Sequence, residues 1–268
     1  MIEKKGSGGF LSMTVISIAN NKGGEGKTTT ALNLGAALSL QGLRVLAVDL
    51  DPQASLTLYL GLDPGELETT SYHVLTKKAP ALSAVMMTRV ASLDLIPASI
   101  DLAAAEMEIS GMMGREFILR DQLATLSDLY DVVLIDNMPS LGVLTVNSLM
   151  ASDFVIVPIE PTYLAFKGLQ MIDTTISEVQ RYRPELSMLG VVITMVDERT
   201  KHAREIISKI RENYHVLGTM IRRSVRFADA AAGNMPIAEF AGANFEGAHA
   251  YAEIAAEVER VVRDHNRK

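Results

Sequence analysis

A glycine-rich loop between a short β-branched run and an apolar helical segment constrains this chain more than any other feature. The run Thr14–Ala19 predicts a strand, Lys27–Leu40 predicts a helix, and three glycines lie between them. Glycines let successive backbone N–H groups turn toward one anion, and a helix N-terminus adds positive charge. The order strand, loop, helix therefore predicts a phosphate-binding loop rather than a turn that only caps a helix.

Further β-branched runs alternate with helical segments, which favours parallel β–α–β units. Strands are also expected at Arg44–Val48, Leu93–Pro97, Asp131–Ile135, Phe154–Pro158 and Val191–Met195. Helices are also expected at Gly114–Leu126, Phe166–Tyr182, Arg204–Asn213 and Ala248–Asp264. Several of these strands are apolar throughout, as strands covered on both faces are. We expect an α/β fold of three layers, with a mostly parallel central sheet, helices on both faces and the ligand beyond the carboxyl ends of the strands.

Length and composition favour a single large domain. The chain has 268 residues, of which 48% are hydrophobic, and we expect one core over residues 13–268. Residues 1–12 contain Gly6-Ser7-Gly8-Gly9 and are expected to form a flexible leader. They lack the apolar stretch of a secretory signal, and no apolar run in the chain is long enough to predict a membrane span. The expected location is the cytoplasm.

Two counts limit the chemistry. The chain has no cysteine, which excludes disulfides, thiolate zinc sites and cysteine-held iron–sulfur clusters. Its formal net charge is −7 at pH 7, so any contact with nucleic acid must come from a local basic patch acting against the overall field.

The loop carries two lysines. Lys27 is placed to reach the β and γ phosphates of a nucleotide, and Thr28 to offer its hydroxyl to Mg²⁺. Lys22 opens the loop, where it could otherwise be a solvated lysine. The heptapeptide of residues 22–28 resembles the deviant Walker A motif of the ParA/MinD superfamily, in which this extra lysine crosses a dimer interface to the partner's ATP.

Longer stretches carry the same resemblance over about residues 13–265. They include residues 96–99, 140–147, 157–169, 194–197 and 236–237. The resemblance implies a P-loop NTPase fold and a slow ATP hydrolase that uses ATP and Mg²⁺. It also implies a homodimer that forms when ATP binds.

The resemblance assigns roles residue by residue. Catalytic roles fall to Lys22, Lys27 and Asp51, the last of which orients the attacking water. Contacts to ATP are expected from Lys22, Gly23, Gly24, Glu25, Gly26, Lys27, Thr28, Thr29, Glu160 and Thr194. The metal is expected at Thr28, Asp51 and Asp136, where Asp136 ends an apolar strand as a Walker B carboxylate does. Asp49 is the alternative for a supporting role, and both Asp49 and Asp51 could instead cap the next helix.

Three residues depart from the family pattern. Glu25 stands where relatives commonly have valine or another small residue, and a carboxylate beside a triphosphate is unfavourable unless it points away or meets a cation. Met138 replaces a proline after the Walker B strand, and Arg222 replaces a proline near the adenine. Glu25 in particular raises the alternative of an ATP-locked scaffold that does not turn over.

The basic residues outside the loop form two clusters, each after a late strand. They are Arg199, Lys201 and Arg204, and then Arg222, Arg223 and Arg226. In a parallel sheet both clusters can lie at one edge, although charged helix faces are more often only solvated. ParA-like dimers bind DNA non-specifically through comparable regions, so the resemblance implies DNA as a partner and a nucleoid-associated location.

The resemblance leaves the cargo open. One hypothesis is plasmid or chromosome partition, with hydrolysis stimulated by a ParB-like adaptor; the alternative is positioning of a protein cargo, such as a microcompartment or chemoreceptor cluster, over the nucleoid. A MinD-like membrane switch is the third. Against it, the last helix carries Glu253, Glu257 and Glu259 beside a small apolar stripe, which predicts a helix packed on the core.

Overall fold

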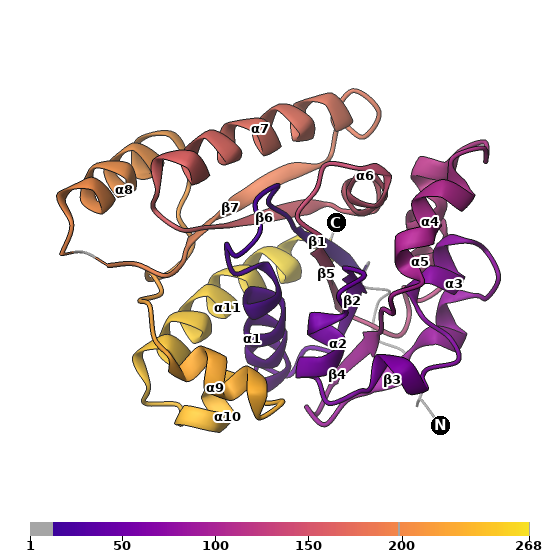
Figure 1. Cartoon of the computed structure of the whole chain (residues 1–268), viewed down its shortest axis with the longest axis horizontal. Helices are drawn as coiled ribbons and strands as arrows, with labels where there is room; N and C mark the ends of the chain where they lie inside the picture. The colour runs from indigo at the N-terminus through magenta and orange to yellow at the C-terminus, as the bar shows by residue number, and fades with distance from the viewer. Residues whose placement is uncertain (1–12, 198, 268) are drawn as a thin grey trace.

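The computed structural model describes residues 13–197 and 199–267, so the leader expected at residues 1–12 lies outside the described residues. Within them, seven strands form one sheet in the order β3-β4-β2-β5-β1-β6-β7 (Figure 1). The strands are β1 (Thr14–Ile18), β2 (Val45–Leu50), β3 (Met86–Met87), β4 (Leu93–Ile96), β5 (Val132–Asn137), β6 (Phe154–Ile159) and β7 (Ser187–Ile193). All neighbours pair in parallel except β3 and β4, which are antiparallel.

Helices fill the connections between the strands. They are α1 (Lys27–Leu40), α2 (Ser55–Tyr59), α3 (Ser71–Leu75), α4 (Leu102–Ile109), α5 (Ile118–Ala124), α6 (Val143–Ala151), α7 (Tyr163–Val179), α8 (Lys201–Asn213), α9 (Arg226–Ala232), α10 (Ile237–Ala241) and α11 (Glu246–His265). Short 3-10 turns lie at Pro64–Glu66, Ala81–Ala84 and Arg115–Phe117.

Alternate side chains of the strands pack against helices on opposite faces of the sheet. Ile16 and Ile18 of β1 are buried in a core shared with α1 and α11, whereas Val15 lies in a core shared with α3, α4, α5 and α6. A third cluster joins β6 and β7 to α7 and α8. Because side chains of a strand alternate between faces, this division confirms the expected three-layer α/β fold.

The expected elements are present, with bounds that differ by a few residues. The helix expected at Gly114–Leu126 is the exception, because it forms a 3-10 turn followed by α5. Gly114 precedes that turn with a φ of 67°, a left-handed conformation that suits glycine and keeps this residue out of the helix. The short edge strand β3 and several short helices were not expected, since segments of two to nine residues leave little periodicity.

The last helix packs on the core, as the sequence predicts. Tyr251, Ile254, Val258 and Val262 of α11 are buried and lie in one cluster with α1, and Figure 1 shows the two helices side by side. In the part of the chain that the structure describes, no helix is long and apolar enough to cross a membrane.

Candidate nucleotide and metal site

The carboxyl ends of five parallel strands converge on the loop between β1 and α1. Ile18 of β1 is in register with Asp136 of β5, which in turn is in register with Asp49 of β2. Thr194 follows β7, and its backbone N–H donates to the carbonyl of Ile159 in β6 at 2.8 Å. Segments far apart in sequence therefore meet at one edge of the sheet, where parallel α/β folds bind their ligands.

The loop has the backbone of a phosphate-binding loop. Gly24 and Gly26 have φ values of 77° and 87°, which side-chain-bearing residues adopt at a cost. Gly26 is the N-cap of α1, so the helix begins at Lys27 and presents the N-terminal N–H groups of Thr28 and Thr29 toward the loop. Thr28 and Thr29 are half-buried, while Gly23 and Gly24 are exposed. These positions fit a bound polyphosphate, and the individual ATP contacts stay predictions.

Lys27 points back into its own loop. Its Nζ donates to the carbonyl oxygen of Lys22 at 3.0 Å, and the residue is buried. Burial lowers the pKa of the Lys27 ammonium, whereas the negative charges of Asp136, Asp51 and Glu25 oppose that shift. Lys27 is therefore the cation that faces the acidic side of the site.

Asp136 is a buried carboxylate with unused acceptors. It is 0% exposed, and neither Oδ1 nor Oδ2 has a hydrogen-bond partner among the described residues. Burial, followed by repulsion from Asp49, raises the pKa of the Asp136 carboxyl well above its ordinary value. An orphaned pair of buried oxygens beside Lys27 and Thr28 is the donor set that a divalent cation would satisfy.

The two aspartates after β2 have different surroundings. Asp49 is fully buried, and its Oδ2 accepts hydrogen bonds from the backbone and the hydroxyl of Thr57 at 3.0 and 2.7 Å. Burial raises the pKa of Asp49 to about 6, although these hydrogen bonds oppose the shift. Asp51 is half-buried, and its Oδ1 accepts from the Gln53 backbone at 2.9 Å. Asp49 thus anchors α2, and Asp51 is the carboxylate with room to hold a water molecule.

The residues present fit Mg²⁺. Within residues 13–197 and 199–267, no group of three or more acidic, histidine or cysteine residues could hold a metal by itself. Mg²⁺ is commonly held by one or two protein carboxylates together with phosphates and water, so Thr28 and Asp136 would hold it, and the contribution of Asp51 stays a prediction. Mg²⁺ bound there would supply positive charge to the β and γ phosphates.

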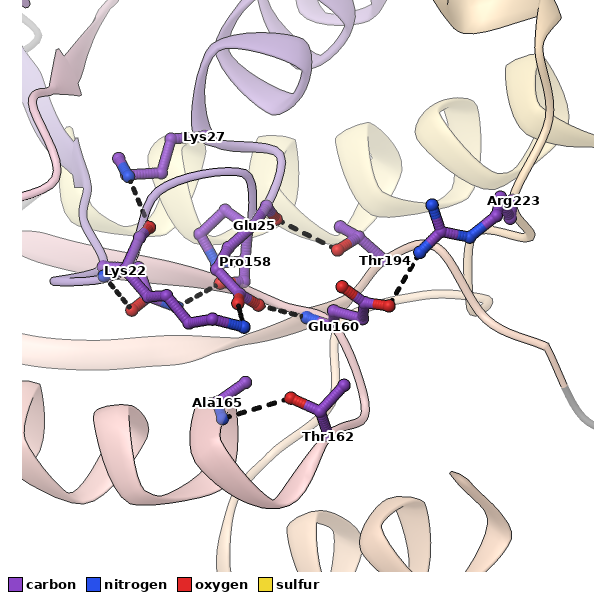
Figure 2. Close-up of polar contacts among 10 residues, drawn as sticks. Lys22, Glu25, Lys27, Pro158, Glu160, Thr162, Ala165, Thr194 and Arg223 are labelled. Carbon is purple, nitrogen blue, oxygen red and sulfur yellow. Dashed lines mark hydrogen bonds and ion pairs between the residues drawn. The ribbon is translucent and has the colours of Figure 1, made fainter. Parts of the chain in front are cut away.

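Glu160 and Thr194 support the loop from neighbouring strands (Figure 2). The Thr194 hydroxyl donates to the Glu25 carbonyl at 3.0 Å, and the Glu160 backbone N–H donates to the Glu25 carboxylate at 2.6 Å. Sequence reasoning missed Asn20, which donates to the Pro158 carbonyl at 2.7 Å and accepts from the Lys22 backbone at 3.1 Å. A polar residue at the end of an apolar strand, next to the loop, was the available signal.

The two remaining departures are also accommodated. Met138 is half-buried against the core beneath α3 to α6, and its carbonyl accepts from the Ser140 backbone at 2.8 Å. Arg222 forms an ion pair with Glu246 at 3.2 Å, so its guanidinium is drawn toward the start of α11.

The two basic clusters lie side by side. Val196 and Arg222 form an isolated parallel bridge, and the Arg223 backbone donates to the Val196 carbonyl at 3.3 Å, which joins the segments after β7 and before α9. All six basic residues named from sequence are exposed. Several have acidic partners: Arg199 pairs with Asp197, Lys201 with Glu205, and Arg223 with Glu160. The segments that carry the two clusters are therefore adjacent, and carboxylates balance several of the basic residues, which together are called the basic surface below.

Comparison with known proteins is consistent with this site. Residues 13–188 match the family described as AAA domain. The sporulation initiation inhibitor protein Soj of Bacillus subtilis is 39% identical over 247 residues, covering 91% of this chain and 97% of Soj. The chromosome partitioning protein ParA of Caulobacter vibrioides is 39% identical over 261 residues, covering 96% of this chain and 97% of that protein.

A solved structure is similar over nearly the whole chain. The crystal structure of cobyrinic acid a,c-diamide synthase from Mycobacterium smegmatis, with bound ADP and magnesium, has a TM-score of 0.82 and 40% sequence identity. The match covers 94% of this chain and 96% of that one. A second structure of that protein holds an ATP analogue and magnesium.

The buried charge of Asp136 generates a stability prediction. An acid whose pKa is higher in the folded chain than in the unfolded chain lowers stability as pH rises through and above the unfolded-state value. Asp136→Asn removes this charge and should raise the free energy of unfolding of the nucleotide-free protein at pH 7 by about 1–2 kcal/mol. The gain should shrink as the pH is lowered toward 4. Urea unfolding followed by circular dichroism across this pH range measures it.

The same variant should lose the stabilisation that ATP and Mg²⁺ together give the wild type. Asp128→Asn, at an exposed position, is the matched control and should change stability by less than about 0.5 kcal/mol. A nucleotide-free Asp136→Asn protein that is no more stable than the wild type at pH 7 would contradict the account of a strained metal carboxylate.

Proposed function

The chain belongs to the ParA/Soj/MinD family of deviant Walker A ATPases, and from that premise we propose that it forms an ATP-dependent dimer that binds DNA without sequence preference and drives DNA partition. It is an ATPase whose substrates are ATP and water. Beyond this activity, we propose that the chain dimerises, that it binds DNA through a basic surface, and that an adaptor protein stimulates its slow intrinsic ATP hydrolysis.

One observation carries the proposal: the two loop lysines differ in exposure. Lys27 is buried and reaches its own loop, whereas the Lys22 side chain keeps 40% of its surface exposed at the mouth of the site. A buried lysine serves the nucleotide bound to its own chain. An exposed lysine on the same loop can serve a nucleotide bound to a second chain, and a cation delivered in this way makes dimerisation depend on the γ phosphate.

The basic surface supports DNA as the partner. One of its arginines, Arg223, is linked to the nucleotide loop through Glu160, whose backbone N–H donates to the Glu25 carboxylate. Two copies in a dimer double this surface, and counterion release makes affinity rise steeply with the number of phosphates contacted. DNA affinity would thus follow the nucleotide state, although the overall charge of the chain is negative.

DNA partition is better supported than positioning of a protein cargo or binding to a membrane. The similar protein from Caulobacter vibrioides is named for chromosome partitioning, which supports a DNA cargo, and the adaptor of the proposal is a ParB-like protein. A protein cargo positioned over the nucleoid would use the same cycle and is the alternative. A membrane output is less well supported, because the apolar stripe of α11 is buried against α1 and is not available to lipid.

The role of Lys22 gives the first test. Lys22→Ala should abolish the dimer that a non-hydrolysable ATP analogue induces in the presence of Mg²⁺, because alanine cannot reach the partner's phosphates. Sedimentation velocity measures the dimer. Lys78→Ala, which removes an exposed ammonium paired with Glu108 on another face, should leave dimerisation intact. Persistence of the dimer in Lys22→Ala would refute the role in trans.

The DNA surface gives the second test. A variant with Arg222, Arg223 and Arg226 all replaced by alanine should bind random-sequence duplexes more weakly and to a similar extent for each sequence. The slope of log affinity against log salt should become shallower by about one for each DNA phosphate that the variant no longer binds. Fluorescence anisotropy with the ATP analogue measures both quantities.

The matched control replaces three other arginines that also have acidic partners. These are Arg89, Arg115 and Arg120, paired with Glu239, Glu116 and Asp121. Loss of affinity in this control, or unchanged affinity in the first variant, would move the DNA surface elsewhere.

A further inference from the structure

Lys22 has a counter-ion within its own loop. Its Nζ lies 2.6 Å from Oε1 of Glu25, three residues along the chain, and Figure 2 shows the contact. The Glu25 side chain is 0% exposed and that of Lys22 is 40% exposed. The sequence left open how a carboxylate could be tolerated beside a triphosphate, and in the structure it meets a cation.

Glu25 is held in place from both ends. Its Oε2 accepts the Glu160 backbone N–H at 2.6 Å, and its carbonyl accepts the Thr194 hydroxyl at 3.0 Å. These donors belong to the segments after β6 and β7, which are fixed by the sheet. Glu25 therefore cannot follow Lys22 if the lysine moves. Lys22 is the partner that can leave, because it is exposed and carried on a flexible four-carbon stem.

The carboxylate of Glu160 is also engaged. It forms an ion pair with Arg223 at 2.7 Å on the basic surface, while its own backbone supports Glu25. The Glu160 carboxylate is thus already paired with a cation, whereas the ion pair of Lys22 is with Glu25. The Lys22 ammonium has one carboxylate partner in the loop and, on dimerisation, would exchange it for the partner's phosphates.

We propose that Glu25 is a positioning residue that holds Lys22 within its own chain and so sets a threshold for dimerisation. This inference rests on the proposed function, because it concerns the lysine that reaches the second chain. Only chains in which Lys22 has left Glu25 are competent to dimerise, and the apparent dissociation constant rises as that fraction falls. A symmetric dimer needs two such chains, so the apparent dissociation constant of the dimer depends on the square of the competent fraction.

Glu25→Gln tests the inference. Glutamine keeps an oxygen for the Glu160 N–H but removes the charge that holds Lys22. At saturating non-hydrolysable ATP analogue and Mg²⁺, the dimer dissociation constant should fall by about tenfold, since an ion pair that reduces the competent fraction about threefold acts in both chains. Sedimentation velocity over a range of protein concentrations measures it, and no dimer is expected with ADP in either protein.

A second readout follows the ion pair in the nucleotide-free monomer. Acetylation of Lys22 by a limiting amount of acetic anhydride, followed by peptide mass spectrometry, should be several times faster in Glu25→Gln than in the wild type. A general loosening of the fold would instead speed all lysines together. Glu239→Gln removes the same charge from the exposed pair with Arg89 and should alter neither readout. Glu25→Val gives the same test should the glutamine variant not fold.

The outcomes separate the inference from the function on which it rests. A wild type that dimerises while Glu25→Gln dimerises no more tightly overturns the inference and leaves the proposed function standing. An unchanged acetylation rate at Lys22 overturns it as well. If neither protein dimerises with the ATP analogue, the proposed dimer is refuted, and the inference about a threshold for dimerisation is refuted with it.

Discussion

Asp136 lies at the carboxyl end of β5 with both carboxylate oxygens buried and without a hydrogen-bond partner among the described residues. A buried charge in this state is costly, and a second acidic group, Asp49, is in register beside it on β2. The nearby ammonium of Lys27 offsets part of the cost. The nucleotide-free site is therefore unfavourable for stability. A divalent cation bound there would offset the buried negative charge, and active sites commonly sacrifice stability for function in this way.

Around this carboxylate, the two lysines of one loop have different surroundings, and the proposed function gives them different roles. Lys27 begins α1, is buried and faces the acidic side of its own site. Lys22 lies at the mouth and is paired with Glu25, which β6 and β7 hold in place. The exposed lysine is available to a second chain only after it leaves that pair. In the proposed dimer, the position of this one ammonium group would link nucleotide binding to assembly.

Much of this could be predicted from sequence, because the informative signals are local. A β-branched run, a glycine-rich loop and an apolar helix are contiguous, and the carboxyl ends of parallel strands must meet at one edge. That reasoning placed Lys27, Thr28 and Asp136 together, as the structure does. It also allowed the two basic clusters to lie at one edge, and the bridge between Val196 and Arg222 brings their segments together.

The rest depended on contacts between residues far apart in the chain. Glu25 and Glu160 are separated by most of the sheet's strands in sequence, so nothing in the loop itself indicated that the Glu160 backbone would bind the Glu25 carboxylate. For the same reason, the partners of Arg222 and Arg223 were not foreseen, and a surface predicted to be basic is partly neutralised by Glu246 and Glu160. Short helices such as α2 and α3 were not predicted from the sequence. Tertiary contacts, such as the hydrogen bond between Asp49 and Thr57, set their positions, and hydrophobic periodicity does not.

The central claim is that the nucleotide state controls DNA binding. The most direct measurement is the binding of the full chain to a random-sequence duplex with ATP, with ADP and with no nucleotide, each over a series of salt concentrations. The account predicts that DNA binds in the presence of ATP and does not bind with ADP or without nucleotide. The slope of log affinity against log salt should be about −5 if a dimer contacts roughly six phosphates. Equal binding in all three states, or none in any of them, would contradict it.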